Sequence, residues 1–208
     1  ARIAICGASI DAHLGGEPLT CWRRMDLPAG SELTLGHCRK GARAYLAVAG
    51  GLQVAKVLGS ASTDLRSGFG GWHGRTLVAG DELSVAGNGT LHCTRLLVDR
   101  RWVDPSEDLD LNAAAIIRVL PGRDLLVDAE ALFDQEWKVE AASNRQGLRL
   151  SGSKLSTASS EDRLSGPVMP GTIQLPPDGQ PIVLMADAQT HGGYPAIGHA
   201  ILADHARL

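Results

Sequence analysis

The sequence predicts a mainly β protein, built as two β barrels with few short helices, and three observations support this. The 208-residue chain contains 25 glycines and 10 prolines, which favours many turns between short elements. Its apolar runs are short and often end at glycine, as buried strands do. A polar, acidic stretch over 99–110 separates two sets of such runs. We therefore expect one barrel over 1–110 and a second over 111–208.

In the first half, the apolar run 2–7 predicts a buried strand, and 43–51 predicts a strand that ends in a double glycine. The stretches 27–33 and 77–83 share the pattern L-x-A-G-x-E-L. Each predicts a tight turn, because glycine accepts a positive φ and Ser or Asp can bond its own backbone. The polar, glycine-rich segment 59–74 predicts a long irregular loop, a kind of loop that often carries function.

In the second half, 114–120 predicts a strand that Pro121-Gly122 stops. Apolar residues at helical spacing in 128–135 predict a short surface helix. Two further apolar segments, 148–150 and 181–185, predict strands. The end of the sequence, 200–208, is weakly helical.

The charge and cysteine pattern excludes several classes of function. The net charge is −3, so no basic footprint for nucleic acid is present. The four cysteines, Cys6, Cys21, Cys38 and Cys93, contain no C-x-x-C pair, and the seven histidines show no metal-ligand spacing, so we expect no metal site on this chain. No apolar run is long enough to span a bilayer, and we expect a cytoplasmic protein with no membrane contact.

No nucleotide-binding motif stands out, but four loops offer polar groups. Gly68–Gly74 lacks the spacing of a phosphate loop, so it is either an anion-binding nest of amides or a plain loop. The S-x-x-K match at 151–154 lacks companion motifs, and we interpret it as chance. The segment 189–195 either presents a polar ligand site or is a structural turn. Arg145 in 144–147 either binds an anion or is a surface residue.

Several ordered segments together carry a family resemblance across essentially the whole chain. The most specific is GQPIVLMADAQT followed by GGYP, over 179–195. The others lie at 41–51, 57–65, 68–75, 143–150 and 170–176. The set resembles the allophanate hydrolase subunit 2 family, also called biotin-dependent carboxyltransferase-like, and within it the 5-oxoprolinase branch. The resemblance implies two tandem cyclophilin-like β barrels. Relative to the family's usual pattern, we expect the N-terminal part of the first barrel and the closing C-terminal strand of the second barrel to be missing.

The resemblance also implies a partner-dependent enzyme. A C-type subunit would act with a B subunit of related fold and use ATP, with Mg²⁺, to phosphorylate 5-oxo-L-proline. An A subunit would then complete hydrolysis to L-glutamate. The alternatives are a non-enzymatic regulator that binds a kinase-inhibitor-type B partner, and an allophanate hydrolase component.

Expected site residues follow from the matching segments. We expect Arg145, Gln189 and Thr190 to be catalytic, with Arg145 binding the anion. Substrate or phosphate binding is expected of Ser62, Thr63, Asp64, Gly70, Gly71, Asn144, Gln174, Gln180, Gly192, Gly193 and Tyr194. His191 stands where close relatives are expected to carry Thr, a change that would alter ligand preference.

Overall fold

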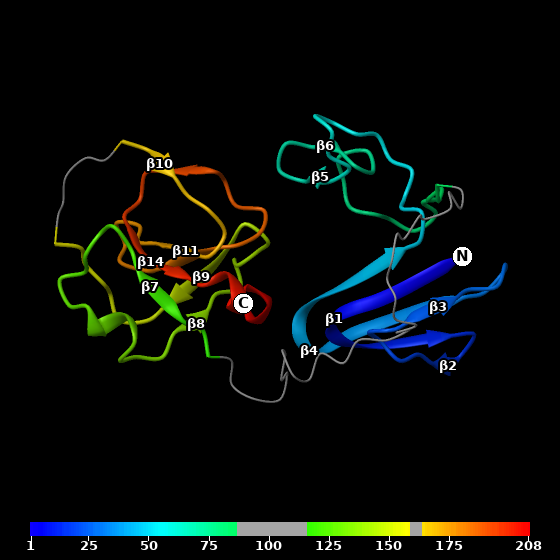
Figure 1. Cartoon of the computed structure of the whole chain (residues 1–208), viewed down its shortest axis with the longest axis horizontal. Helices are drawn as coiled ribbons and strands as arrows, with labels where there is room; N and C mark the ends of the chain where they lie inside the picture. Colours follow the sequence, from blue (N-terminus) through cyan, green and yellow to red (C-terminus); the bar gives the residue numbers. More distant parts are fainter. Residues whose placement is uncertain (87–115, 159–163) are drawn as a thin grey trace, which may run out of the picture. The chain divides into compact units, whose positions relative to one another are not determined.

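The computed structural model describes residues 1–86, 116–158 and 164–208 (Figure 1). The linker predicted at 99–110 lies outside these ranges. The chain divides into two compact units, Ala1–Ala113 and Ala114–Leu208. Strands predominate in both, and the helices among the described residues are short 3₁₀ turns, so the mainly β prediction is confirmed.

Unit 1 is organised around one long antiparallel pair of strands (Figure 1). Strand β1 (Arg2–Leu14) pairs with β4 (Leu33–Val48) along most of its length. On its other side β1 pairs with β3 (Arg24–Asp26) and β2 (Glu17–Pro18). The predicted strand at 2–7 is therefore confirmed and extends to Leu14. The buried apolar side chains of this unit's described residues come from β1; they are Ile3, Ile5, Ala8 and Ala12.

The repeated L-x-A-G-x-E-L segments form the two turns that the sequence predicts. Gly30 and Gly80 have φ of +77° and +91°, and the N–H groups of Ser31 and Asp81 close the turns three residues back. The segment 59–74 is less irregular than expected, because it contains an antiparallel hairpin of β5 (Thr63–Asp64) and β6 (Phe69–Gly70).

Unit 2 contains a six-stranded antiparallel sheet and a separate two-stranded ribbon. The sheet order is β7-β14-β11-β12-β9-β8. Its strands are β7 (Val119–Pro121), β14 (Ala196–Ala200), β11 (Thr172–Gln174), β12 (Ile182–Leu184), β9 (Gly147–Ser151) and β8 (Lys138–Val139). The ribbon pairs β10 (Gly166–Pro167) with β13 (His191–Gly192). The strands predicted at 148–150 and 181–185 are confirmed.

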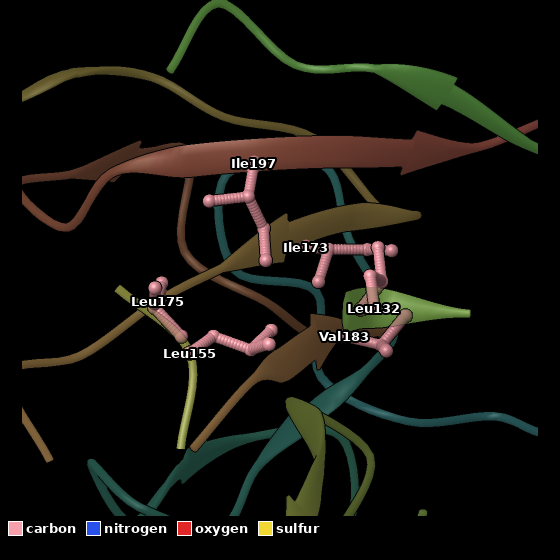
Figure 2. Close-up of a cluster of buried hydrophobic side chains, with 6 residues drawn as sticks. All are labelled: Leu132, Leu155, Ile173, Leu175, Val183 and Ile197. Carbon is pink, nitrogen blue, oxygen red and sulfur yellow. The ribbon is translucent and has the colours of Figure 1, made fainter. Parts of the chain in front are cut away.

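The hydrophobic core of unit 2 lies against one face of this sheet. Figure 2 shows its six buried side chains, which point toward one another; they are Leu132, Leu155, Ile173, Leu175, Val183 and Ile197. Ile173 stands at the middle of β11, between Thr172 and Gln174. Since side chains alternate along a strand, Thr172 and Gln174 point to the opposite face from the core.

Two elements of unit 2 are shorter than the sequence predicts. Residues 114 and 115 of the strand expected over 114–120 lie outside the described residues. Within the described part, the strand begins at Val119, because the backbone N–H of Arg118 donates instead to the carboxylate of Asp204 at 2.8 Å. The helix expected over 128–135 is a 3₁₀ turn, η2 (Glu130–Leu132). Side chains of Gln135 and Trp137 donate to the carbonyls of Ala131 and Leu132, so these acceptors do not extend the helix.

A second 3₁₀ helix, η3 (Leu202–Arg207), follows β14, in agreement with the weak helical pattern predicted there. Asp204 on this helix is buried, at 1% exposure, and its two carboxylate oxygens accept bonds from the Arg118 guanidinium at 2.7 and 3.0 Å. The ion pair therefore fastens η3 to the segment that leads into β7.

Candidate functional site

The candidate site of unit 2 is built around Gln174, a carboxamide that is 2% exposed. It lies at the end of β11, on the sheet face opposite the hydrophobic core. Its Nε2 donates to the carbonyl of Tyr194 at 3.4 Å. A buried amide side chain is stabilised when its polar atoms find partners, so the segment that contains Tyr194 is held over Gln174.

The ribbon of β10 and β13 lies beside this carboxamide. Gly192 in β13 approaches Gln174 so closely that a Cβ added at Gly192 would collide with Nε2. Glycine is required here for space, because any side chain would displace the amide. The sequence-predicted residues Gln174, Gly192 and Tyr194 are therefore brought together.

The remaining predicted residues of this segment flank the ribbon and are exposed. Gln189, Thr190, Gly193 and Tyr194 are all accessible to a ligand. The hydroxyl of Thr190 lies 3.1 Å from His191 Nδ1, so these neighbours share a hydrogen bond. The segment Gln189–Tyr194 thus presents a carboxamide, a hydroxyl, an imidazole and a phenol to solvent, and these groups suit a small polar ligand.

Asn144 and Arg145 form a turn at the other end of β12 from Gln174. Gln174 pairs with Ile182 at the start of β12, whereas Gly147, just after this turn, pairs with Leu184 at its end. Asn144 Oδ1 accepts from the N–H of Gln146 at 2.8 Å, which shapes the turn. The Arg145 guanidinium is half exposed and forms an ion pair with Asp187 at 2.9 Å, two residues before Gln189.

Gln180 uses its carboxamide inside the fold. Its Oε1 accepts from the N–H of Gly152 at 2.8 Å, and its Nε2 donates to the Gly152 carbonyl at 3.1 Å. Both polar atoms are engaged with one backbone residue, so Gln180 fastens the loop before β12 to the segment after β9.

The predicted residues of unit 1 cluster in the β5–β6 hairpin. Thr63 pairs with Gly70, and its hydroxyl accepts from the N–H of Trp72 at 3.3 Å. Asp64 accepts from the N–H groups of Ser67 and Arg66, and these bonds, that of Ser67 first, hold the pKa of Asp64 below its ordinary value.

The other three predicted residues of this hairpin differ in exposure. Ser62 is exposed, whereas the backbones of Gly70 and Gly71 pack closely on Ser62 and Thr63. This hairpin carries a carboxylate and backbone amides on one compact segment.

A functional candidate that the sequence analysis missed is Arg123, which follows Pro121-Gly122. The Pro-Gly motif predicts only the end of a strand and carries no signal for the basic residue that follows it. In the structure its neighbour Asp124 is buried and accepts from the N–H of Ala196 at 2.6 Å, which anchors this segment beside the start of β14. Arg123 is thereby brought next to the ribbon that contains Gly192.

Two kinds of feature are absent from the described residues. Within 1–86, 116–158 and 164–208, no group of three or more His, Cys, Asp or Glu side chains is arranged to hold a metal ion. In the same part of the chain, none of the helices has the length and apolar character needed to cross a membrane.

Comparison with known proteins identifies relatives along the full chain. A family model described as carboxyltransferase domain, subdomain A and B, matches residues 1–208. The C subunit of 5-oxoprolinase from Escherichia coli strain K12 is 38% identical over 97% of this chain, and that from Haemophilus influenzae is 35% identical over 98%. In each case the chain spans 63% of the relative's length. The urea amidolyase of Saccharomyces cerevisiae is 29% identical over 92% of this chain and 11% of its own length.

Solved structures share the fold. The crystal structure of TTHA0988 matches with a TM-score of 0.75 and 32% identity, over 99% of this chain and 38% of that chain. The urea carboxylase of Kluyveromyces lactis matches with a TM-score of 0.77 and 25% identity, over 99% of this chain and 20% of that chain. Together with the family match over every residue, these similarities show that the chain belongs to the family of carboxyltransferase domains, subdomains A and B.

Proposed function

We propose that this chain acts as a C-type subunit of an ATP-dependent 5-oxoprolinase. It works with a B subunit of related fold to phosphorylate 5-oxo-L-proline, and an A subunit then hydrolyses the activated lactam to L-glutamate. The two relatives named as C subunits of 5-oxoprolinase, each aligned with nearly all of this chain, support the assignment. ATP is the co-substrate, and the proposed reaction belongs to the cytoplasm.

The observation that carries the proposal is the buried carboxamide of Gln174 under the exposed segment Gln189–Tyr194. A lactam has one N–H donor and one carbonyl acceptor, and a carboxamide side chain offers the complementary acceptor and donor. Gly192 lets the ribbon pack directly against this carboxamide, so Gln174 holds the ribbon in place, and the groups open to a ligand are those of the exposed segment. The site therefore suits a small cyclic amide.

The chemistry requires positive charge and hydrogen-bond donors more than a nucleophile. A lactam carbonyl is a poor electrophile, and phosphorylation of its oxygen makes attack by water feasible. Phosphoryl transfer depends mainly on positioning and on stabilising negative charge. We assign Gln189 and Thr190 to binding of the lactam, and Arg145 with Asn144 to binding of the anion. The backbone amides of Gly192 and Gly193 would donate hydrogen bonds. Tyr194 would form a wall of the site.

In unit 1, taken by itself, we assign phosphate binding to the β5–β6 hairpin. The candidates are Ser62, Thr63, Asp64, Gly70 and Gly71. The described residues offer amides and hydroxyls that suit a phosphate, but no cluster of metal ligands. Mg²⁺ in proteins is bound largely through phosphate oxygens and water. We therefore assign no step to a metal held by this chain.

Reconstitution tests the proposal. The chain is combined with its B and A partners, and formation of ADP and L-glutamate from 5-oxo-L-proline is measured. ATP-dependent glutamate formation that disappears when this chain is left out is the expected result. A complex that assembles but forms no glutamate would contradict the enzyme assignment and favour a regulator that only binds the B partner.

A second candidate is a component that acts on an acyclic urea-type amide. The similarity to the urea amidolyase of Saccharomyces cerevisiae favours it, because that relative aligns with 92% of the chain. The same reconstituted complex, supplied with allophanate in place of 5-oxo-L-proline, discriminates between the two. Ammonia release from allophanate, together with no glutamate formation from 5-oxo-L-proline in the parallel assay, would favour this second function.

A further inference from the structure

Two cysteines of unit 1 lie opposite each other on neighbouring segments of the chain. Cys6 is on β1, and Cys21 precedes β3, which pairs with β1 in the antiparallel sense. The backbone N–H of Trp22 donates to the carbonyl of Ile5 at 2.7 Å. Because the two segments run in opposite directions, one step back from Trp22 and one step forward from Ile5 bring Cys21 opposite Cys6.

The spacing of such a pair suits a disulfide bond. Directly opposed residues of an antiparallel pair have Cα atoms about 4.5–5.5 Å apart, and their side chains point to one face. A disulfide bond requires Cα atoms about 4.4–6.8 Å apart. Cys6 and Cys21 are both partly buried and both are present as thiols, so a small reagent can reach them.

The electrostatics of Cys21 also place the two thiols near each other. Burial raises the pKa of the Cys21 thiol above its ordinary value, a hydrogen bond with the backbone of Ile10 opposes this shift, and the charge of Cys6 adds to it. A neighbouring group changes a pKa in this way only over a short distance. The strand pairing and the electrostatics therefore agree that Cys6 and Cys21 are neighbours.

Backbone hydrogen bonds fix the segment that contains Cys21 at both ends. The N–H of Leu19 donates to the carbonyl of Ala12 at 2.8 Å, and Trp22, bonded to Ile5, has a φ of +63° that turns the chain into β3. Residues 19–22 are thus held along β1. A covalent bond between the two thiols would therefore require little movement of the backbone.

We propose that Cys6 and Cys21 form a dithiol site that a small disulfide, such as oxidised glutathione, converts to an intramolecular disulfide. One thiolate attacks the S–S bond of the reagent, forms a mixed disulfide and releases one molecule of reduced thiol. The second thiolate attacks the protein sulfur of the mixed disulfide, forms the protein S–S bond and releases the second reduced thiol. The two protein thiols lose two protons and two electrons, and the reagent gains both.

This modification would act on the stability of unit 1. Cys6 and Cys21 are 15 positions apart, so the bond closes a short loop and restricts the unfolded chain. It also attaches the segment before β3 covalently to β1, the strand that contains the buried apolar side chains described in this unit. Disulfides in a reducing compartment are usually transient and respond to oxidants. The dithiol is therefore the resting form, and oxidation gives a reversible, more stable form.

The test uses the full chain with Cys38 and Cys93 replaced, so that only the proposed pair can react. C38S/C93S is incubated with oxidised glutathione, its thiols are titrated with Ellman's reagent, and its intact mass is measured. Both thiols should disappear, the mass should fall by that of two hydrogen atoms, and no glutathione should stay attached. Dithiothreitol should restore both thiols.

C21S/C93S is the matched control, because it also keeps two thiols, those of Cys6 and Cys38. Cys38 is exposed on β4 and lies opposite Ile10, on the other side of β1 from β3. This variant should form no internal disulfide, and any thiol that reacts should retain glutathione.

Calorimetry gives a second readout. Oxidation of C38S/C93S should raise the temperature at which unit 1 unfolds by about 10 °C, the effect expected of a disulfide that closes a loop of this length. The same treatment should leave the unfolding temperature of C21S/C93S unchanged. An unchanged temperature in oxidised C38S/C93S would contradict the stabilising role.

Three outcomes of the thiol measurements would overturn the inference. C38S/C93S could keep both thiols, it could retain glutathione or form dimers without an internal bond, or C21S/C93S could form an internal disulfide to the same extent. Circular dichroism of the reduced variants establishes that each is folded before oxidation, and alanine replaces serine in a variant that is not. None of these readouts depends on the proposed function.

Discussion

At the residue scale, Gln174 is the side chain on which the proposed chemistry depends most. It is the end residue of a three-residue strand, buried, and bonded to the carbonyl of Tyr194. Leucine has a similar size but neither a donor nor an acceptor. Q174L should therefore retain the fold, with a loss of about 1 kcal/mol for the one hydrogen bond removed.

The same substitution should affect turnover far more than stability. The carboxamide holds the segment that contains Tyr194, so its loss should displace the exposed groups assigned to the lactam, and we expect kcat/KM for 5-oxo-L-proline to fall by about 100-fold. Steady-state glutamate formation by the reconstituted complex measures this. Q135L is the control, because the Gln135 carboxamide bonds only backbone in the contacts described for it. Similar turnover in Q174L and Q135L would remove Gln174 from the site.

The sequence was informative about single residues only where the signal was local. The two Ala-Gly turns could be predicted, since a glycine at positive φ and a Ser or Asp beside it act within four residues. The position of Arg123 against the ribbon of β10 and β13 could not be predicted. It depends on the pairing of Gly166 with Gly192 and on Asp124 bonding Ala196, contacts between segments far apart in the chain.

At the element scale, the η3 helix is held by a buried carboxylate. Hydrogen bonds from the Arg118 guanidinium, and then from its backbone N–H, hold the pKa of Asp204 well below its ordinary value. A carboxyl with a lowered pKa stabilises the folded state above its unfolded pKa, about 3.9, and this contribution is lost as the pH falls through the folded value. Unit 2 should therefore lose stability as the pH falls below about 4.

D204N tests this account of η3. It should lower the urea midpoint of unit 2 at pH 7 and flatten its dependence on acid pH, because the carboxylate that titrates is gone. Urea unfolding followed by circular dichroism from pH 7 to pH 3 measures both effects. D134N removes one negative charge from an exposed position and serves as the control. An acid dependence in D204N as steep as in wild type would show that other carboxylates govern it.

The bounds of strands were predicted best where the strand and an apolar run in the sequence begin or end at nearly the same residues. Strand β12 stands within the run 181–185, and β1 begins where the first apolar run begins. The predicted strand at 114–120 and helix at 128–135 were wrong in extent, because tertiary partners took their backbone groups. Asp204 captures the N–H of Arg118, and Trp137 captures the carbonyl of Leu132. Neither competitor can be identified from local pattern.

At the scale of the whole molecule, the two units differ in the apolar side chains that they bury. Among the described residues, unit 1 buries apolar side chains of β1 alone, whereas unit 2 buries side chains from several strands and loops. The larger set of buried side chains should make unit 2 the more stable unit. We therefore expect two thermal transitions, with unit 1 unfolding at the lower temperature.

Truncation of one core residue in each unit assigns the transitions. Ile5 is 1% exposed and Ile173 is 5% exposed, and replacing either with alanine should cost about 2–5 kcal/mol in the unit that contains it. I5A should lower only the first transition and I173A only the second, as measured by calorimetry, because neither residue belongs to the other unit's core. If I173A lowered both transitions equally, the units would unfold as one cooperative body. A substitution in either core would then destabilise the ligand-binding groups of both units.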